Sequence, residues 1–240
     1  MTRVIAVQEK NDENQNCLLF ALINVGMANA AISSWGTKFR DDLWRPELGI
    51  KYHPYKVEED KVMILPDLNW KKLGASRTNA AKYNEKNFDP PFPAYTSGHA
   101  TFCCVVFQMI ANFYQTYDIS FNYTSPEWNG DSVDEFNRTR ACIIHEISSL
   151  VDGMAECSAS RTFNGVHYAF DSVTGCAVGM DIANYVFETM YTPKKGSRQK
   201  VMTTNAVPTR IAEYLANTPT SGYEPVLCDE IPSYPIHSSD

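Results

Sequence analysis

Long apolar runs, CxxC pairs and an excess of basic residues are all missing from this 240-residue sequence. Because no run of 18 or more apolar residues occurs, and Met1 to Asn16 lack a signal-peptide hydrophobic segment, we expect a soluble chain with no membrane partner. The 21 Lys and Arg are outnumbered by 28 Asp and Glu, for a net charge of -7. Nucleic-acid binding usually requires a basic face, so we also expect no nucleic-acid partner.

The cysteines form an odd set without metal-ligand spacing. They are Cys17, Cys103, Cys104, Cys142, Cys157, Cys176 and Cys228. We expect neither a zinc site nor a complete disulfide framework, and we expect most of these residues to pack as small apolar side chains.

Helical periodicity dominates what is present. From Cys17 to Trp44, apolar residues at spacings of three and four predict one or two helices that end at Pro46. Clean helical spacing after His99 predicts a helix to about Tyr117. Further helices are expected at about 132–157, 164–190 and 209–216. The sequence therefore predicts an all-α protein, a helical bundle.

One domain accounts for a chain of this length with 44% hydrophobic residues. We place a helical, anion-binding domain at 17–192, between a polar N-terminal segment at 1–16 and a mostly irregular C-terminal tail at 193–240. Within the domain, the segment 46–96 contains six prolines and is expected to be a long irregular loop. Loops of this length in compact domains are often functional.

Three short stretches carry groups suited to binding an anion, and the first contains Lys38 and Arg45. Seven residues are two turns of a helix, so both side chains are expected on one face. Asp42 would lie on the same face, and a solvated helix with internal ion pairs is the alternative interpretation. The bulky Trp44 beside Arg45, next to the helix-ending Pro46, favours a functional position.

The second stretch is Thr96-Ser97-Gly98-His99, at the start of a predicted helix. A serine here is commonly a helix cap, which is the alternative interpretation. However, Gly98 lets an anion approach the backbone, and a helix N-terminus presents free amides and the positive end of the dipole. His99 at the mouth of such a site is a candidate for proton transfer.

The third stretch is Ser160-Arg161 followed by His167 and Asp171. The last two lie four residues apart, so we expect them to share a helix face on which the carboxylate selects the imidazole tautomer. Arg161 would point elsewhere on the same helix, so we expect it in the turn before that helix begins. Two guanidinium groups, an ammonium, a hydroxyl, a glycine amide and two imidazoles together predict a pocket for a tetrahedral oxyanion.

In type, order and spacing these stretches resemble the superfamily of type 2 phosphatidic acid phosphatases and vanadium haloperoxidases. Six residues separate Lys38 from Arg45-Pro46, Ser97-Gly98-His99 follows, and five residues separate Arg161 from His167. The longer strings Trp35 to Ile50 and Pro91 to Phe102 resemble the vanadium-dependent haloperoxidases more than the phosphatases.

The resemblance implies a vanadate cofactor with His167 as the direct protein ligand to vanadium. The vanadate oxygens would be held by Lys38, Arg45, Ser97, the Gly98 amide and Arg161. His99 would act as acid and base, so His99, Lys38 and His167 are the catalytic candidates. The implied substrates are hydrogen peroxide, a halide and a small organic molecule.

The same resemblance implies roles for residues around the pocket. Phe92 stands five residues before Ser97, where chloride-oxidising relatives carry phenylalanine and bromide-specific relatives tend to carry histidine. Trp35 matches an aromatic residue on the halide side, and Asp171 supports His167. These matches favour a chloroperoxidase-like enzyme, whereas packing in the core is the alternative for both aromatics.

Haloperoxidases of this type are usually longer and add an N-terminal helical half. A homo-oligomer or a missing N-terminal half is therefore expected to complete the pocket. A phosphatase with His167 as nucleophile and His99 as proton donor is the alternative enzyme, because phosphate and vanadate have similar shapes. A non-enzymatic oxyanion-binding helical domain is the third interpretation.

Overall fold

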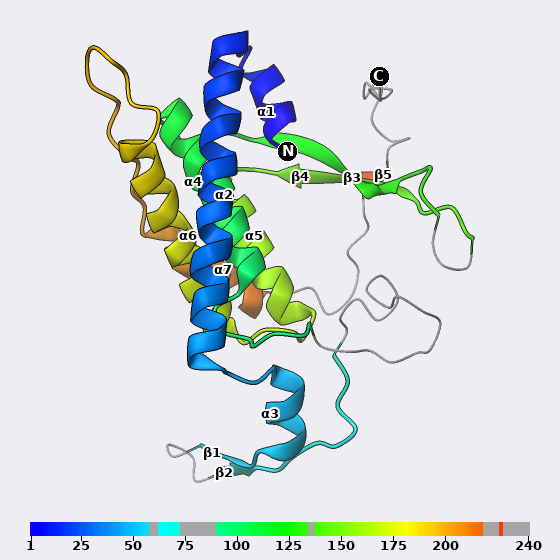
Figure 1. Cartoon of the computed structure of the whole chain (residues 1–240). Helices are drawn as coiled ribbons and strands as arrows, with labels where there is room; N and C mark the ends of the chain where they lie inside the picture. Colours follow the sequence, from blue (N-terminus) through cyan, green and yellow to red (C-terminus); the bar gives the residue numbers. More distant parts are fainter. Residues whose placement is uncertain (58–61, 73–89, 134–136, 218–225, 228–240) are drawn as a thin grey trace.

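The computed structural model describes the chain except for residues 58–61, 73–89, 134–136, 218–225 and 228–240. Its long helices lie side by side in a bundle (Figure 1). The helices are α1 (Thr2–Gln8), α2 (Glu13–Asp41), α3 (Pro46–Tyr52), α4 (Gly98–Tyr114), α5 (Leu150–Phe163), α6 (Ala169–Thr189) and α7 (Ala206–Ala216). The predicted helical-bundle class is therefore confirmed.

A single helix, α2, spans the segment for which one or two helices were expected. It begins before Cys17 because Asp12 and Gln15 form a capping box, with both backbone-to-side-chain hydrogen bonds at 2.8 Å. It ends at Asp41, and Asp42 follows in the left-handed region with φ 47°. Pro46 then opens α3 in its first turn, where a missing N–H costs nothing.

The bundle is organised around α4, in which 13 of 17 residues are buried. This apolar helix packs against α2, α5 and α6, which explains why it has no polar face. The helix predicted after His99 is thereby confirmed. Those predicted at about 164–190 and 209–216 correspond to α6 and α7.

Close contact between α4 and α6 depends on two glycines. A Cβ at Gly179 would lie 2.4 Å from the Thr101 carbonyl oxygen, and one at Gly175 would lie 2.7 Å from the Ser97 carbonyl oxygen. The two backbones approach closely because neither glycine has a side chain. This contact holds the start of α4 beside the start of α6.

A strand replaces part of a predicted helix. The helix expected at 132–157 is wrong in its first half, where β4 (Cys142–Ile147) pairs antiparallel with β3 (Phe121–Asn129) and with β5 (Val226–Leu227). The short run Cys142-Ile143-Ile144 suits either structure by periodicity, and its β-branched residues fit a half-buried strand. The actual helix, α5, begins only at Leu150 behind its Ser149 cap.

The segment 46–96 is less irregular than expected. Besides α3, it contains an antiparallel pair of short strands, β1 (Tyr55–Val57) and β2 (Val62–Ile64). Residues 73–89 of this segment lie outside the described part of the chain.

Cysteine pairing also differs from expectation. Disulfides join Cys103 to Cys157 and Cys104 to Cys176, so α4 is cross-linked to both α5 and α6. Among the described cysteines, Cys17 is free and exposed. The expectation that the cysteines pack as small apolar side chains was wrong for these four. The paired cysteines lie 54 and 72 positions apart, so their pairing depends on how the helices pack.

The segment Glu13–Tyr52, which contains α2, is long and apolar enough to cross a membrane by length and composition. No other helix in the described residues meets this test. One such helix is weak support for a membrane span, because a core helix passes the same test. Leu19 and Leu22 of α2 are fully buried inside the bundle.

Candidate functional site

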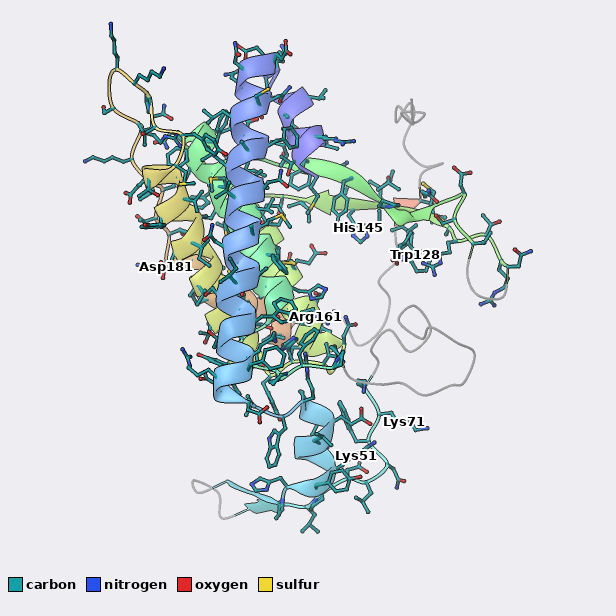
Figure 2. All side chains as sticks on the ribbon, in the orientation of Figure 1. Lys51, Lys71, Trp128, His145, Arg161 and Asp181 are labelled. Atoms are coloured by element: carbon teal, nitrogen blue, oxygen red, sulfur yellow. A yellow bond between two sulfur atoms is a disulfide. The ribbon has the colours of Figure 1, made fainter. Side chains whose placement is uncertain are left out.

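The three predicted stretches meet at one end of the bundle. The end of α2, the start of α4, the end of α5 and the loop before α6 all lie there (Figure 1). Figure 2 shows Arg161 at this end of α5. The structure therefore brings together residues that the sequence distributes over more than 130 positions, from Lys38 to Asp171.

Lys38 is fully buried in the last turn of α2. Its ammonium donates hydrogen bonds to the carbonyl oxygens of Pro93 at 2.9 Å and Ala94 at 2.7 Å. An exposed Lys38 on a solvated helix face, the alternative interpretation, is therefore wrong. These contacts hold the loop before α4 against α2 and keep the ammonium at the base of the site.

Arg45 lies beside Lys38 for a reason other than the predicted one. The two residues do not share a helix, because α2 ends at Asp41 and Arg45 is the N-cap of α3. Its guanidinium donates to the Phe92 carbonyl through Nε at 3.2 Å and Nη2 at 3.1 Å. Nη1 donates to the Val166 carbonyl at 2.8 Å and lies 3.0 Å from His167 Nε2.

Ser97 caps α4, as both interpretations of its position require. Its hydroxyl accepts from the Ala100 amide at 3.4 Å, and its own amide donates to the Asp171 carbonyl at 3.1 Å. A glycine at position 98 is required by packing, since a Cβ there would lie 2.9 Å from the Trp35 ring. The α4 N-terminus is thus built against α2 and the α6 start.

His99 is exposed at the rim of the site. Partial desolvation, together with repulsion from Arg161, Lys38 and Arg45, lowers the pKa of His99 to about 4. The imidazole keeps contact with water at the rim, and the three neighbouring cations add to the effect of its partial burial. The imidazole is therefore neutral at pH 7 and is free to accept a proton from a bound group.

His167 and Asp171 form the predicted pair, with Nδ1 3.0 Å from Oδ2. The pair does not share a helix face, because α6 begins at Ala169 and His167 precedes it. Burial, followed by repulsion from Arg45, lowers the pKa of His167 to about 2, so the ring is neutral. Nδ1 therefore carries the proton and donates a hydrogen bond to Asp171. The lone pair of Nε2 faces the cations.

Arg161 lies in the last turn of α5 and not, as expected, in the turn that follows. That turn is formed by Asn164 and Gly165, the latter with φ 70°. Burial lowers the pKa of Arg161, which still remains charged. Its Nε is buried without a hydrogen-bond partner in the described part of the chain.

Positive charge exceeds negative charge in this cluster. Lys38, Arg45 and Arg161 face the single carboxylate of Asp171, whose Oδ1 accepts no hydrogen bond from the described residues. Burial, then repulsion from Arg45, lowers the pKa of Lys38 to about 7. Burial raises the pKa of Asp171 to about 6 despite the nearby cations. Such a charge balance favours an anionic ligand.

Aromatic rings form one wall of the site. The Trp35 and Phe92 ring centroids lie 5.0 Å apart, and Phe102 lies 6.1 Å from Trp35. The Lys38 ammonium lies 5.4 Å from the Phe92 centroid, and the Arg45 guanidinium carbon lies 5.3 Å from it. Phe92 therefore packs between the two cations, so both the packing role and a place beside the pocket apply to it.

Several backbone groups and an apolar pocket at this end of the bundle could not be predicted from the sequence. The carbonyl groups that hold Lys38 and Arg45 carry no sequence signal, because every residue has one. An apolar pocket of about 430 Å³ lies next to Trp44. It is lined by Leu43, Trp44, Gly49, Ile50, His53, Leu65, Tyr168 and Phe170. Its residues come from four segments, so no local pattern marks it.

Comparison with known proteins is consistent with this architecture. Residues 18–196 match the family described as the VCPO second helical-bundle domain. The chain belongs to this vanadium haloperoxidase family. A vanadium chloroperoxidase of Curvularia inaequalis is 34% identical over 178 residues, which cover 64% of this chain and 28% of that protein.

Solved structures show the same fold. A bacterial vanadium-dependent iodoperoxidase matches with a TM-score of 0.57 and 24% identity, over 77% of this chain and 36% of that chain. A bacterial vanadium-dependent chloroperoxidase in its holo form matches with a TM-score of 0.50 and 18% identity, over 69% and 34%. The chain thus spans about a third of the length of these relatives.

Proposed function

We propose that this chain is a vanadium-dependent haloperoxidase that oxidises a halide with hydrogen peroxide at a bound vanadate. The observation that carries the proposal is the group of three buried or half-buried cations around the Nε2 lone pair of His167. The family membership of residues 18–196 supports it.

The residues present fit a vanadate anion. The buried Arg161 Nε lacks a partner in the described residues, and the cluster has more positive than negative charge. We propose that Lys38, Arg45, Arg161, Ser97 and the Gly98 amide hold its oxygens and that His167 Nε2 is the ligand to vanadium. When bound, vanadate supplies a Lewis acid that activates hydrogen peroxide without changing oxidation state.

The chain's own residues then provide positions and protons. Asp171 holds the proton of His167 on Nδ1, so Nε2 keeps a free lone pair with which to bind a metal. His99, neutral at pH 7, takes a proton at the rim of the site and returns it later in the cycle. The net reaction converts halide, hydrogen peroxide and one proton into hypohalous acid and water, which balances atoms and charge.

Halide preference and the organic acceptor belong to the same proposal. Phe92 lies against the Lys38 ammonium and shields it from water on one side, together with Trp35. A hydrophobic wall beside a cation favours a halide that loses its hydration shell on binding. That wall alone favours bromide, which is less strongly hydrated than chloride. Phenylalanine at position 92, as in chloride-oxidising relatives, is what supports our proposal of chloride oxidation, with bromide also accepted and a small organic molecule as acceptor of the oxidised halogen.

The proposal is tested by measuring halide oxidation by the purified chain with hydrogen peroxide, with and without added vanadate. We expect turnover only with vanadate, and inhibition by phosphate that competes for the same cations. Halogenation that is independent of vanadate contradicts the proposal. His167→Ala should lose vanadate binding, and unchanged vanadate affinity in this variant contradicts the ligand assignment.

A phosphatase is the second candidate, supported by the same neutral His167 paired with Asp171. The Nε2 lone pair is suited to attack phosphorus. His99 would protonate the leaving oxygen after it has itself taken up a proton, because its pKa is about 4. Hydrolysis of a phosphomonoester by the vanadate-free protein, with no halide oxidation after vanadate addition, would favour this activity. If neither reaction occurs but phosphate binds, the chain is an oxyanion-binding domain without catalysis.

A further inference from the structure

Two adjacent cysteines connect α4 to the helices on either side of it. Cys103 is bonded to Cys157 on α5, and Cys104 is bonded to Cys176 on α6. Each of the three helices joined in this way carries or directly follows a site residue.

The bond between Cys103 and Cys157 lies one helical turn from the site on each helix. Cys103 follows His99 by four residues on α4, and Cys157 precedes Arg161 by four residues on α5, so each pair shares a helix face. The sulfur of Cys103 lies 2.8 Å from the His99 carbonyl oxygen, and that of Cys157 lies 4.0 Å from the same oxygen. The disulfide therefore sets how close the last turn of α5 comes to the first turn of α4.

Electrostatic repulsion acts against this approach. Arg161 lowers the pKa of both Lys38 and His99, so its positive charge is felt across the site. Its Nε donates no hydrogen bond to any group in the described part of the chain. Without an anion, the cations repel one another, and the cross-link opposes the resulting separation of α5 from α4.

The Cys104–Cys176 disulfide is not needed to hold its two helices together. The start of α6 is already held to α4 by the hydrogen bond from the Ser97 amide to the Asp171 carbonyl at 3.1 Å. Gly175 and Gly179 also bring the two backbones into direct contact. Removing the bond between Cys104 and Cys176 leaves these contacts in place, so this bond provides a matched control.

We propose that the Cys103–Cys157 disulfide positions Arg161 for oxyanion binding, and that reduction of this bond weakens the binding. Arg161 is the group that contacts the anion, and the two cysteines are positioning residues. The inference rests on the oxyanion-binding part of the proposed function and applies equally to vanadate and phosphate.

The two bonds differ in access to a reductant. Cys104 and Cys176 are 0% and 1% exposed, whereas Cys157 is only half-buried. A small dithiol reaches Cys157 first, breaks the sulfur–sulfur bond and leaves two protein thiols, while the dithiol itself is oxidised to a cyclic disulfide. Selective loss of the outer bond is therefore expected under mild reduction.

The test compares two double variants of the full chain, Cys103→Ser with Cys157→Ser, and Cys104→Ser with Cys176→Ser. Affinity for inorganic phosphate is measured by calorimetry at one pH, and folding is checked by circular dichroism. We expect roughly tenfold weaker binding in the first variant, the lower range for loss of one charge-assisted hydrogen bond, and less than about threefold change in the second. Both variants are expected to lose thermal stability.

A double-mutant cycle with Arg161→Ala separates positioning from general destabilisation. If the disulfide acts through Arg161, its removal should have no further effect on phosphate affinity in the Arg161→Ala protein. An equal loss in both backgrounds, an equal loss in the two double variants, or no loss at all overturns the inference. If the serine variant fails to fold, mild dithiol reduction of the wild-type protein gives the same comparison.

Failure of this inference is distinct from failure of the proposed function. A wild-type chain that binds no phosphate or vanadate contradicts the proposed function itself. A wild-type chain that binds oxyanion with the same affinity before and after loss of the outer disulfide contradicts only the positioning role.

Discussion

The guanidinium of Arg45 contacts the imidazole of His167 directly, with Nη1 3.0 Å from Nε2, although 122 positions separate the two residues. Nε2 is the atom proposed to ligate vanadium, so a ligand at this nitrogen must take the place of the Arg45 contact. The hydrogen bonds of Arg45 to the Phe92 and Val166 carbonyls keep the guanidinium close when that contact is exchanged. Arg45 therefore supports the structure of the site, and it is also one of the residues proposed to hold the ligand.

Replacing Arg45 with lysine should weaken both stability and oxyanion binding. A lysine keeps the charge but cannot reach the Phe92 carbonyl, the Val166 carbonyl and His167 together. We expect the free energy of unfolding to fall by about 2–4 kcal/mol and phosphate affinity to fall roughly tenfold or more. Urea unfolding and calorimetry measure the two effects.

Arg40→Lys is the matched control for this substitution. Arg40 pairs with Asp41 at the surface, and its side chain is 70% exposed. Such pairs contribute little, so we expect less than about 0.5 kcal/mol change and unaltered affinity. Equal effects of the two lysine variants contradict the assigned role of Arg45.

Oxyanion affinity should depend on pH through Lys38. Burial and then repulsion from Arg45 lower the pKa of Lys38 to about 7. Without a bound anion, the ammonium therefore loses its positive charge as the pH rises through 7. Affinity for sulfate, whose own charge is constant in this range, should therefore fall between pH 6 and 8.5. Lys38→Met should bind more weakly, with a flat profile above about pH 7, where Asp171, whose pKa is about 6, has already ionised. An equally steep fall above pH 7 in this variant assigns the titration to another group.

The same shift predicts how stability of the anion-free protein changes with pH. Above about pH 7 the folded state holds fewer protons at Lys38 than the unfolded state, in which the lysine keeps its ordinary value of 10.5. The unfolding free energy should therefore rise with pH from about 7 upward. Saturating sulfate should remove this rise, because a bound anion stabilises the charged lysine.

Contact between α4 and α6 should be intolerant of a single methyl group. A Cβ at Gly179 would lie 2.4 Å from the Thr101 carbonyl oxygen, which is backbone and cannot move aside. We expect Gly179→Ala to lower the free energy of unfolding by about 1–3 kcal/mol. Gly36→Ala on α2, where nothing lies within 4 Å, should instead add about 0.5–1 kcal/mol. The reverse order in urea unfolding contradicts the packing described.

His99 should affect turnover more than binding. It lies exposed at the rim and is neutral at pH 7, so His99→Ala removes a proton acceptor without removing charge from the pocket. Given halide-oxidising activity, we expect kcat to fall by about 10²–10⁴ while vanadate affinity stays within about threefold. Unchanged kcat, or affinity lost in proportion to kcat, contradicts its acid–base role.

Most helices could be predicted because their signals are local. The buried face of α4 repeats at helical spacing, and its start is marked by Ser97 and Gly98. The boundary of β4 could not be predicted in the same way, because a run such as Cys142-Ile143-Ile144 suits a strand or a helix until its neighbours in space are known. Strand pairing with Phe121–Asn129 decided between the two.

Local spacing was an unreliable guide to why site residues meet. The helix face expected for Lys38 and Arg45 does not exist, since Asp42 ends α2 between them. His167 meets Asp171 from outside the helix, and the cysteine pairs join residues 54 and 72 positions apart. Each of these outcomes depends on how whole helices pack, which residue spacing does not encode.

The sequence by itself determined the helical class, the set of groups able to bind a tetrahedral oxyanion and the order in which they occur, because side-chain chemistry and helical periodicity are local properties. Only the tertiary structure decided that Lys38, Arg45 and Arg161 share one site with a single carboxylate, that Trp35 covers Gly98, and that disulfides join α4 to its neighbours. Burial, charge balance and cross-linking arise between segments that are distant in the chain. They take effect only when the helices pack together.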